Sequence, residues 1–289
     1  MSITREKDLL VPRIQAENMI KMLKKGERLD GRGLLDYRTI TVVLNPIEKS
    51  EGSALVRLGN TQVIAGIKLE LSKPFEDRPG EGILQVHAEF VPLASPSFEP
   101  GPPDENAIEV ARVIDRSLRE SKAIKLDELA IEPGKTVWAI YDDIYLIDHH
   151  GNIIDAGMLA SMLALQITRM PQLIQTNEGY KIDKSVKERP IPLSTLVTTV
   201  TLGIFKDIII VDPTLEEEVL ADSLVTIAVD EHERICGIQK RGHAGLSREI
   251  LERSIEIAID KGKWLIQQLR KILNNPSEYM KPLSESYQW

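Results

Sequence analysis

The first third of the chain alternates hydrophobic and polar residues with a period of two, which is typical of half-buried β-strands. Four segments follow this pattern: residues 37–44, 53–58, 61–67 and 83–90. Gly59-Asn60 separates the second segment from the third and is a signal for a tight hairpin turn. A segment rich in proline and glycine, residues 96–103, ends this run of predicted strands.

Helical periodicity begins at two places. Residues 13–27 predict a short amphipathic helix, and Asp104 suits the N-cap of a second helix whose apolar residues recur three and four positions apart. These apolar residues are Ala107, Val110, Ala111, Ile114 and Leu118. Residues 154–170 are almost wholly apolar and too few to span a bilayer, so they predict a buried helix.

The second half of the chain repeats the order of strands followed by helices. In this second half, predicted strands cover residues 196–205, 208–211, 225–230 and 234–239, and a long helix covers residues 247–273, whereas the predicted strand 137–147 belongs to the first half. This order favours an α+β fold with antiparallel sheets over a doubly wound sheet. The sequence thus predicts two related halves, each an antiparallel sheet packed with helices.

Changes of composition divide the chain into four parts. Lysines, glycine and prolines replace the apolar pattern within residues 176–192, where we expect the boundary between the halves. The predicted parts are an N-terminal helical extension (1–27), a first half (28–190), a second half (191–275) and a C-terminal tail (276–289). We expect the chain from residue 274 onward to be extended and loosely held.

Composition excludes several classes of protein. The 44 acidic and 36 basic residues give a net charge of −8, which excludes a surface that coats nucleic acid with positive charge. Aromatic residues make up only 4%, too few for a surface built on many stacked bases. One cysteine excludes internal disulfides and cysteine-based zinc sites. No apolar stretch reaches about 18 residues, so we expect a cytoplasmic protein without a membrane partner.

Two short motifs suggest chemistry but favour structural interpretations. Residues 133–136, Pro-Gly-Lys-Thr, superficially resemble a phosphate-binding loop, yet Leu129 stands where that loop requires glycine and a strand follows. We therefore expect a turn. His149 and His150 adjoin a tight turn at residues 151–152 and have no obvious third ligand, so no metal site is expected.

Two further features are a cluster of acidic residues and the single cysteine. Five clustered carboxylates could hold Mg²⁺ or transfer protons, but such a run is more often a solvated loop. They are Asp212, Glu216, Glu217, Glu218 and Asp222. Cys236 lies in a strand-like run, where a buried structural thiol is expected, and the chain has no G-x-S-x-G motif for a serine nucleophile.

Three arginines form a stripe on the helix that begins near Asp104. Arg112, Arg116 and Arg119 lie within about 60° of each other around a helix that turns 100° per residue. Like charges repel, so the stripe needs partners. Glu105 and Glu109 could pair with it as an ordinary solvated face. Alternatively the stripe binds an anion, since the planar guanidinium makes paired contacts with phosphate. The residues alone leave both interpretations open.

Several motifs resemble the RNase PH family of phosphorolytic exoribonucleases. Arg-Leu-Asp-Gly-Arg at 28–32, Gly-Ser-Ala at 52–54 and Leu-Gly-Asn-Thr at 58–61 are similar to the opening of that family. Phe-Glu-Pro-Gly-Pro-Pro-Asp-Glu-Asn-Ala at 98–107, with Arg-Val-Ile-Asp-Arg at 112–116, resembles its non-catalytic members in the archaeal exosome. Asp-Pro-Thr at 212–214, with Glu218 and Asp222, fits the second half of the pattern. The resemblance extends over roughly residues 20–275.

The resemblance implies an RNase PH-like fold and a set of partners. It implies a heterodimer with a catalytic RNase PH-like subunit, and three heterodimers that close into a six-membered ring threaded by single-stranded RNA and joined by RNA-binding cap subunits. Arg112 and Arg116 match residues that reach across the dimer interface toward RNA phosphates. Arg119 has no role assigned by the resemblance.

Departures from the family pattern imply that this chain is not catalytic. Active members carry two arginines at the positions where this chain has Glu105 and Asn106. They also carry a Gly-Thr-Arg or Gly-Ser-Arg loop that holds phosphate, whereas residues 157–159 of this chain read Gly-Met-Leu. Counted from Asp212, the aspartate that acts as general acid is replaced by Leu224. No catalytic residue, cofactor or metal is therefore expected. One alternative is that the chain is itself a phosphorolytic exoribonuclease. Another is a metabolic enzyme of a similar α+β fold, such as a small-molecule kinase, which would need a glycine-rich phosphate loop that this sequence lacks.

Overall fold

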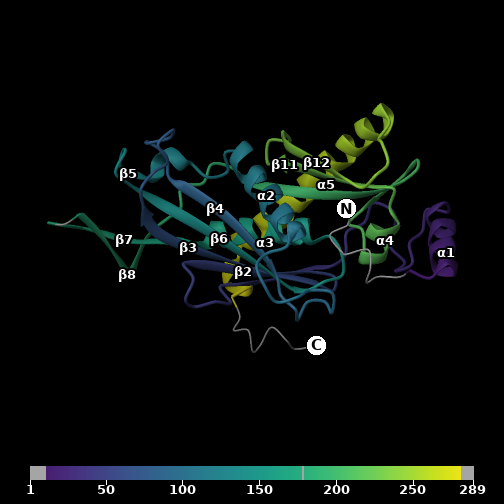
Figure 1. Ribbon diagram of the computed structural model, residues 1–289, viewed down its shortest axis with the longest axis horizontal. Helices are drawn as coiled ribbons and strands as arrows, with labels where there is room; N and C mark the ends of the chain where they lie inside the picture. The colour runs from purple at the N-terminus through teal and green to yellow at the C-terminus, as the bar shows by residue number, and fades with distance from the viewer. Residues whose placement is uncertain (1–10, 178, 281–289) are drawn as a thin grey trace.

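The computed structural model describes residues 11–177 and 179–280, which fold into four layers (Figure 1). A six-stranded sheet is followed by two helices, a four-stranded sheet and a long helix. Each sheet has helices on at least one face, so the α+β prediction is confirmed.

The first sheet belongs to the first half of the chain. Across the sheet its strands are β1 (Ile40–Leu44), β2 (Gly52–Leu58), β3 (Thr61–Ser72), β6 (Thr136–Asp148) and β4 (Ile83–Phe90), with β5 (Ala130–Glu132) against β6. Leu58 pairs with Thr61, which confirms the predicted hairpin turn at Gly59-Asn60. The turn of residues 133–136 joins β5 to β6, as expected.

One pair of strands corrects the prediction of purely antiparallel sheets. Strand β4 runs parallel to β6. Helix α2 (Glu105–Glu120) lies between these two strands in the sequence, and a crossover helix returns the chain in the same direction. Asp104 caps α2 as predicted, because its Oδ1 accepts a hydrogen bond from the Ala107 amide at 2.8 Å.

The second sheet is antiparallel throughout and lies between two helices. Its strands are, in order, β10 (Ile208–Val211), β9 (Val197–Phe205), β11 (Ser223–Asp230) and β12 (Ile235–Arg241). Every residue of β9 is buried, because α3 (Ile153–Ile167) packs on one face and α5 (Arg248–Asn274) on the other. Strands covered on both faces lose the alternation of polar and apolar residues.

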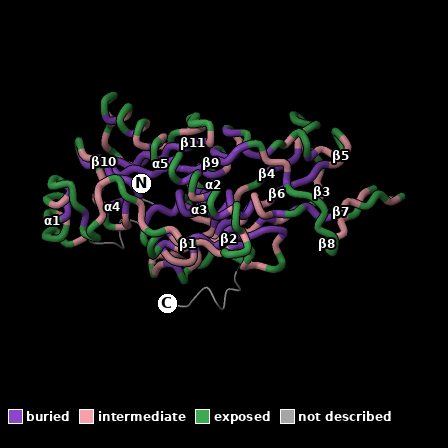
Figure 2. Tube along the Cα trace, turned by 180° about the vertical axis from the view of Figure 1, so that it is seen from behind, coloured by how far each residue is buried: buried purple, intermediate pink, exposed green. Residues whose placement is uncertain are grey.

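Helix α3 is the centre of the molecule and packs against β2, β3 and β9. Its residues from Ile153 to Leu165 are all buried, and Figure 2 shows this buried interior between the two sheets. Helix α1 (Arg13–Leu23) lies at one end of the molecule, where Met19 and Leu23 pack against Phe205 and Ile210. Helix α4 (Leu215–Leu220) follows β10. None of the described helices is long and apolar enough to cross a membrane.

The segment predicted as a boundary is a β-ribbon. Strands β7 (Arg169–Thr176) and β8 (Gly179–Pro190) pair with each other and project from the body of the molecule (Figures 1 and 2). Most residues of β8 are exposed, so its sequence is polar and shows no alternation. The predicted helix 154–170 is correspondingly too long at its end, because Thr168 is already extended and leads into β7.

The tail is held more firmly than predicted. Residues Pro276–Glu278 form a short 3₁₀ turn, and the Leu44 amide donates a hydrogen bond to the Tyr279 carbonyl at 2.8 Å. The expectation of an extended, loosely held chain is therefore wrong for this part. Its remainder, residues 281–289, lies outside the described residues.

A carboxylic acid is buried in the core of the first half. Asp142 of β6 is fully buried between Ile140 and Ile144, on the face of the strand that packs toward α3. Burial raises its pKa to about 7, although the Ser161 hydroxyl opposes this rise and the charge of Asp143 adds to it. The folded protein therefore binds a proton between about pH 4 and pH 7 that the unfolded chain releases.

Replacing Asp142→Asn tests this buried acid. Because the folded-state pKa is raised, wild-type stability decreases as the pH rises from about 4 to 7, by up to about 4 kcal/mol at 1.4 kcal/mol per unit. The variant should lack this decrease and melt at a higher temperature than wild type at pH 8, with the difference shrinking toward pH 4. Glu70→Gln, at an exposed position on β3, is the control. If the melting temperatures of wild type and Asp142→Asn changed with pH by the same amount across this range, the raised pKa of Asp142 would be contradicted.

Candidate functional site

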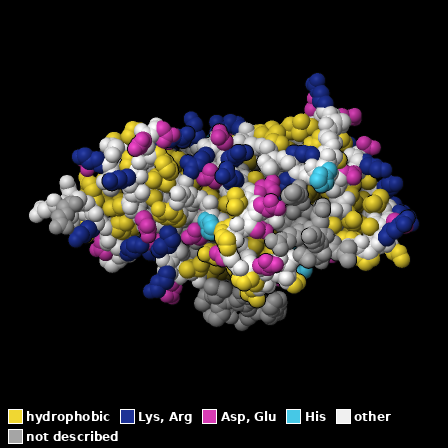
Figure 3. Space-filling model, viewed as in Figure 1, with side chains coloured by type: hydrophobic (Ala, Val, Ile, Leu, Met, Phe, Trp, Pro, Cys, Tyr) yellow, Lys and Arg dark blue, Asp and Glu magenta, His cyan; other side chains and the backbone are white. Residues whose placement is uncertain are grey.

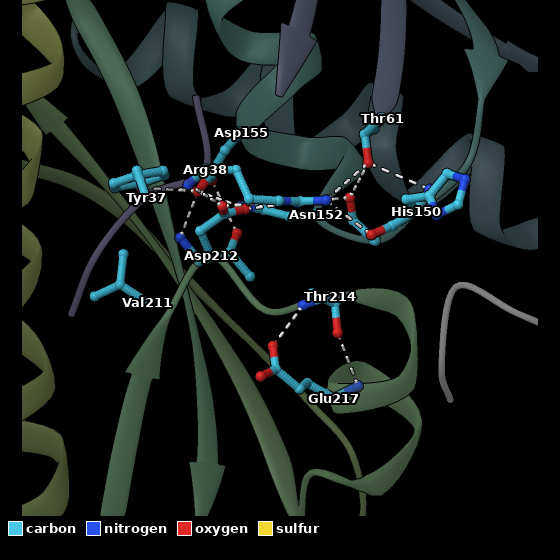
Figure 4. Close-up of polar contacts among 12 residues, drawn as sticks. Tyr37, Arg38, Thr61, His150, Asn152, Asp155, Val211, Asp212, Thr214 and Glu217 are labelled. Carbon is cyan, nitrogen blue, oxygen red and sulfur yellow. Dashed lines mark hydrogen bonds and ion pairs between the residues drawn. The ribbon is translucent and has the colours of Figure 1, made fainter. Parts of the chain in front are cut away.

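A buried polar network joins the two halves of the molecule, with Asp212 at its centre (Figure 4). Asp212 follows β10 and is fully buried. Arg38 donates from Nε to Oδ2 at 2.9 Å and from Nη2 to Oδ1 at 2.6 Å, and Arg32 donates from Nη1 to Oδ2 at 2.9 Å. Burial opposes the charge, yet the hydrogen bonds and positive charge of Arg38 keep the pKa of Asp212 below its ordinary value.

A second buried ion pair reinforces this junction. Arg28 donates from Nε to Glu217 Oε1 at 2.9 Å and from Nη2 to Oε2, and both side chains are almost fully buried. Its remaining hydrogen bonds reach the carbonyls of Val211, Asp212 and Asp36 at 2.6, 2.8 and 3.4 Å. Glu217 also accepts a hydrogen bond from the Thr214 amide at 2.7 Å, which completes a capping box at the start of α4 (Figure 4).

The acidic cluster is therefore not the solvated loop that the sequence favours. Asp212, Glu217 and Glu218 are buried, whereas Glu216 and Asp222 are exposed. Arginines from distant parts of the chain neutralise Asp212 and Glu217, and Glu218 accepts a hydrogen bond from the Asn152 amide. No group of three or more histidine, cysteine or acidic residues within 11–177 and 179–280 could hold a metal ion.

The start of α3 is tied into the same network. Asn152 has left-handed backbone torsion angles and donates from Nδ2 to Asp212 at 2.7 Å and to Asp155 at 2.9 Å. Asp155 also accepts hydrogen bonds from Tyr37, Thr199 and Thr201. Burial raises the pKa of Asp155 to about 6, although these hydrogen bonds oppose the rise. The network is an internal framework, with its donors and acceptors directed at one another.

The segment that we expect, from the resemblance, to stand in place of a phosphate loop is part of the hydrophobic core. Gly157, Met158 and Leu159 lie in α3, and both hydrophobic side chains are at most 2% exposed. Leu224, at the position counted for the general acid, is 4% exposed on β11 and pairs with Arg241 of β12. Glu218 nearby is buried, which raises its pKa, and its Oε1 accepts the Asn152 amide at 2.7 Å.

The arginine stripe separates into two kinds of residue. Arg119 forms an ion pair with Asp115 at 2.9 Å and donates to the Leu84 carbonyl. Arg112 and Arg116 are exposed, and neither forms an ion pair or hydrogen bond with another described residue. Figure 3 shows dark blue side chains gathered over the part of this face where Figure 1 places α2. Two guanidinium groups therefore remain available on one face of α2.

The glutamates offered as ordinary partners do not neutralise this stripe. Glu109 Oε1 accepts a hydrogen bond from Gln239 Nε2 of β12 at 2.9 Å. Glu105 is exposed at the first turn of α2 and pairs with no arginine among the described residues. Among residues 11–177 and 179–280, Arg112 and Arg116 thus lack the ion pairs with Glu105 and Glu109 that the solvated-face interpretation requires.

The remaining candidates from the sequence have structural surroundings. His149 is buried against Phe98, with ring centroids 5.6 Å apart, and burial lowers its pKa to about 4. His150 is exposed beside Asp148, so the adjacent histidines diverge as expected. Cys236 is only half-buried on β12, which corrects the expectation of a buried thiol, and partial burial raises its pKa to about 11.

Comparison with known protein families identifies the family to which this chain belongs. Residues 36–171 match the model described as the 3′ exoribonuclease family, domain 1, or RNase PH, and residues 195–261 match domain 2 of the same family. This chain belongs to the RNase PH family. Its two matched regions contain the two sheets that the buried network joins.

Individual RNase PH relatives are similar over nearly the whole chain. The exosome complex component Rrp42 of Saccharolobus islandicus is 44% identical over 273 residues, 94% of this chain and 99% of that one. That of Aeropyrum pernix is 46% identical over 274 residues, with the same coverage. A chain of the Archaeoglobus fulgidus exosome with RNA bound to the active site superposes with a TM-score of 0.80 and 39% identity, covering 88% of this chain and 97% of that one.

The buried network is the part of the site that the sequence does not reveal. Arg38 and Asn152 carry no motif that distinguishes them from surface residues, and their partner Asp212 is distant in sequence. The left-handed turn at Gly151-Asn152 is the one local signal that marks this region, because glycine and asparagine tolerate that conformation.

Replacing Asp212→Asn tests the importance of the network. The substitution leaves Arg38, whose side chain is only 9% exposed, without the carboxylate that neutralises it, whereas Arg32 keeps Asp30 as a partner, so the free energy of unfolding should fall by about 3–5 kcal/mol. Urea unfolding measures this change. Asp207→Asn, at an exposed position beyond β9, is the control. Equal stability of the two variants would show that the junction does not depend on this charge.

Proposed function

We propose that this chain is a non-catalytic subunit of an archaeal-type exosome, a cytoplasmic 3′–5′ phosphorolytic exoribonuclease. Its two halves, residues 28–190 and 191–275, form one RNase PH-like body that pairs with a catalytic RNase PH-like subunit. Three such pairs close into a six-membered ring that carries RNA-binding cap subunits. Similarity to proteins named exosome complex component Rrp42, over 94% of this chain, supports the assignment.

The RNA contact rests on one observation, the two unpaired arginines on α2. Arg112 and Arg116 are one helical turn apart, about 6 Å along the axis, and both are exposed. A guanidinium makes bidentate, charge-assisted hydrogen bonds with phosphate oxygens. Arg119 is not part of this site, because Asp115 and the Leu84 carbonyl already bind it. The net charge of −8 does not oppose binding, since two cations on one face set the local field.

The chain lacks the groups that phosphorolysis requires. The reaction needs inorganic phosphate held in place and the leaving 3′ oxygen protonated. Met158 and Leu159 are buried hydrophobic side chains that offer neither hydroxyl nor positive charge. Leu224 transfers no proton. Asp222 is exposed and accepts a hydrogen bond from the Lys206 amide at 2.7 Å, but a carboxylate alone does not hold phosphate.

The isolated chain should therefore release no nucleoside diphosphates from single-stranded RNA and phosphate. Leu224→Asp alone should also be inactive, because Met158 and Leu159 still leave phosphate unbound. Chromatography of the reaction products measures this, with the ring assembled from both subunits as the positive control. Phosphate-dependent release by the pure chain, abolished in the Asp222→Asn variant, would instead make this protein an enzyme.

The assembled ring should lose RNA affinity when both arginines are replaced. Each phosphate contact on single-stranded RNA contributes about 0.7 to the slope of log affinity against log salt, so Arg112→Ala with Arg116→Ala should flatten the slope by roughly 1.4. The loss should be similar for different RNA sequences, because phosphate contacts do not read bases. RNA degradation by the ring should also slow. Salt-titrated binding measures the effect, after light scattering has established six chains per ring.

A matched control removes the same charge from another helix. Arg248→Ala with Arg253→Ala changes two exposed arginines on α5 and should leave the salt slope unchanged. Equal slopes for wild type and the α2 double variant, in rings that still assemble, would remove Arg112 and Arg116 from the RNA path. Failure of the wild-type chain to form a ring would overturn the proposed function itself.

A further inference from the structure

Two acidic residues flank Arg112 on the surface of α2. Glu109 lies three residues before Arg112 and Asp115 three residues after it, each about 60° around the helix and on opposite sides. Residues three apart are neighbours on a helix surface, and opposite charges at this spacing attract each other. Within residues 11–177 and 179–280, neither acid forms an ion pair or hydrogen bond with Arg112. Both acids are held by other residues instead.

Asp115 is held by Arg119, which is itself anchored to the first sheet. Arg119 donates from Nε to Asp115 Oδ1 at 3.0 Å and to Oδ2 at 2.9 Å, so both carboxylate oxygens accept hydrogen bonds. Nη2 of the same guanidinium donates to the Leu84 carbonyl of β4. The side chains of Arg119 and Asp115 are only 31% and 25% exposed. Asp115 therefore has a fixed partner and does not neutralise Arg112.

Glu109 is held by a residue of the second sheet. Gln239 of β12 donates from Nε2 to Glu109 Oε1 at 2.9 Å, and both residues are half-buried. An amide side chain carries no charge, so Gln239 binds this carboxylate without adding a further cation beside α2. The hydrogen bond ties Glu109 to β12, although Arg112 stands at pairing distance along the helix.

We propose that Arg119 and Gln239 are positioning residues for the RNA contact of Arg112. Each occupies one acid, Asp115 or Glu109, and so leaves the Arg112 guanidinium free to bind an RNA phosphate. This inference rests on the proposed function and deepens its RNA contact. A guanidinium paired with a carboxylate has fewer N–H groups to offer, and the carboxylate repels phosphate. Arg119 thus contributes to RNA binding through Asp115, without touching RNA.

The first test replaces Arg119→Ala in the assembled ring. Asp115 then loses its partner and pairs with Arg112, so RNA affinity should fall about fivefold. The slope of log affinity against log salt should flatten by roughly 0.7, the contribution of one phosphate contact on single-stranded RNA. Removing the released acid as well, in Arg119→Ala with Asp115→Asn, should restore both the affinity and the slope. This double variant has the same net charge as wild type.

A matched control separates the release of Asp115 from a change of charge. Arg119→Ala with Glu105→Gln also has the net charge of wild type and removes an acid from the same helix, but it leaves Asp115 in place. This variant should keep the flattened slope of Arg119→Ala. Light scattering verifies the ring, and melting temperatures verify that each variant is folded.

The second test acts from the other side of Arg112 and leaves Arg119 in place. Gln239→Leu keeps a side chain of similar size but removes the donor, so Glu109 is released and the slope should flatten as it does for Arg119→Ala. Glu109→Gln with Gln239→Leu should restore the slope. This test decides the inference if rings with Arg119→Ala do not assemble.

Three outcomes would overturn the inference while the proposed function stands. The first is an unchanged slope for Arg119→Ala and Gln239→Leu, in rings whose slope Arg112→Ala with Arg116→Ala does flatten. The second is a slope that Asp115→Asn fails to restore, because Arg119 would then act on RNA directly. The third is loss of assembly in both single variants, which would make their role structural. An unchanged slope after Arg112→Ala with Arg116→Ala would instead remove the RNA contact and this inference together.

Discussion

The structure depends on the carboxylate of Asp212, which holds the two halves of the chain in one relative position. Two arginines from the segment before β1 and Asn152 from the start of α3 donate hydrogen bonds to it. Burying these charges is costly, and the cost is offset only if every partner is in place. Such a cluster tolerates one arrangement and rejects small displacements. It therefore fixes the position of the second sheet relative to α3.

The central position of α3 explains why almost all of this helix is buried. With a sheet on each side, the helix gains packing from every hydrophobic side chain it carries. Met158 and Leu159 are therefore part of the core. The positive charges that remain available to other molecules are on the outside, where Arg112 and Arg116 are exposed on α2.

The sequence predicts the features that depend on neighbouring residues. Strands β4 and β10 and the Asp104 cap agree with the prediction, because periodicity and capping are local properties. The stripe of Arg112 and Arg116 is also local, since one helix carries both. Features that depend on remote contacts were not predictable: Arg38 is 174 residues from Asp212, and Arg28 is 189 from Glu217. The β7–β8 ribbon was missed for another reason, because strands exposed on both faces show no alternation.

The proposed RNA contact depends on the same packing. Helix α2 packs against β4 and α3, so the backbone that carries Arg112 and Arg116 is fixed, while their exposed side chains are free to sample many rotamers. RNA bound at this position would restrict those side chains at an entropic cost, which the hydrogen bonds between guanidinium and phosphate must offset.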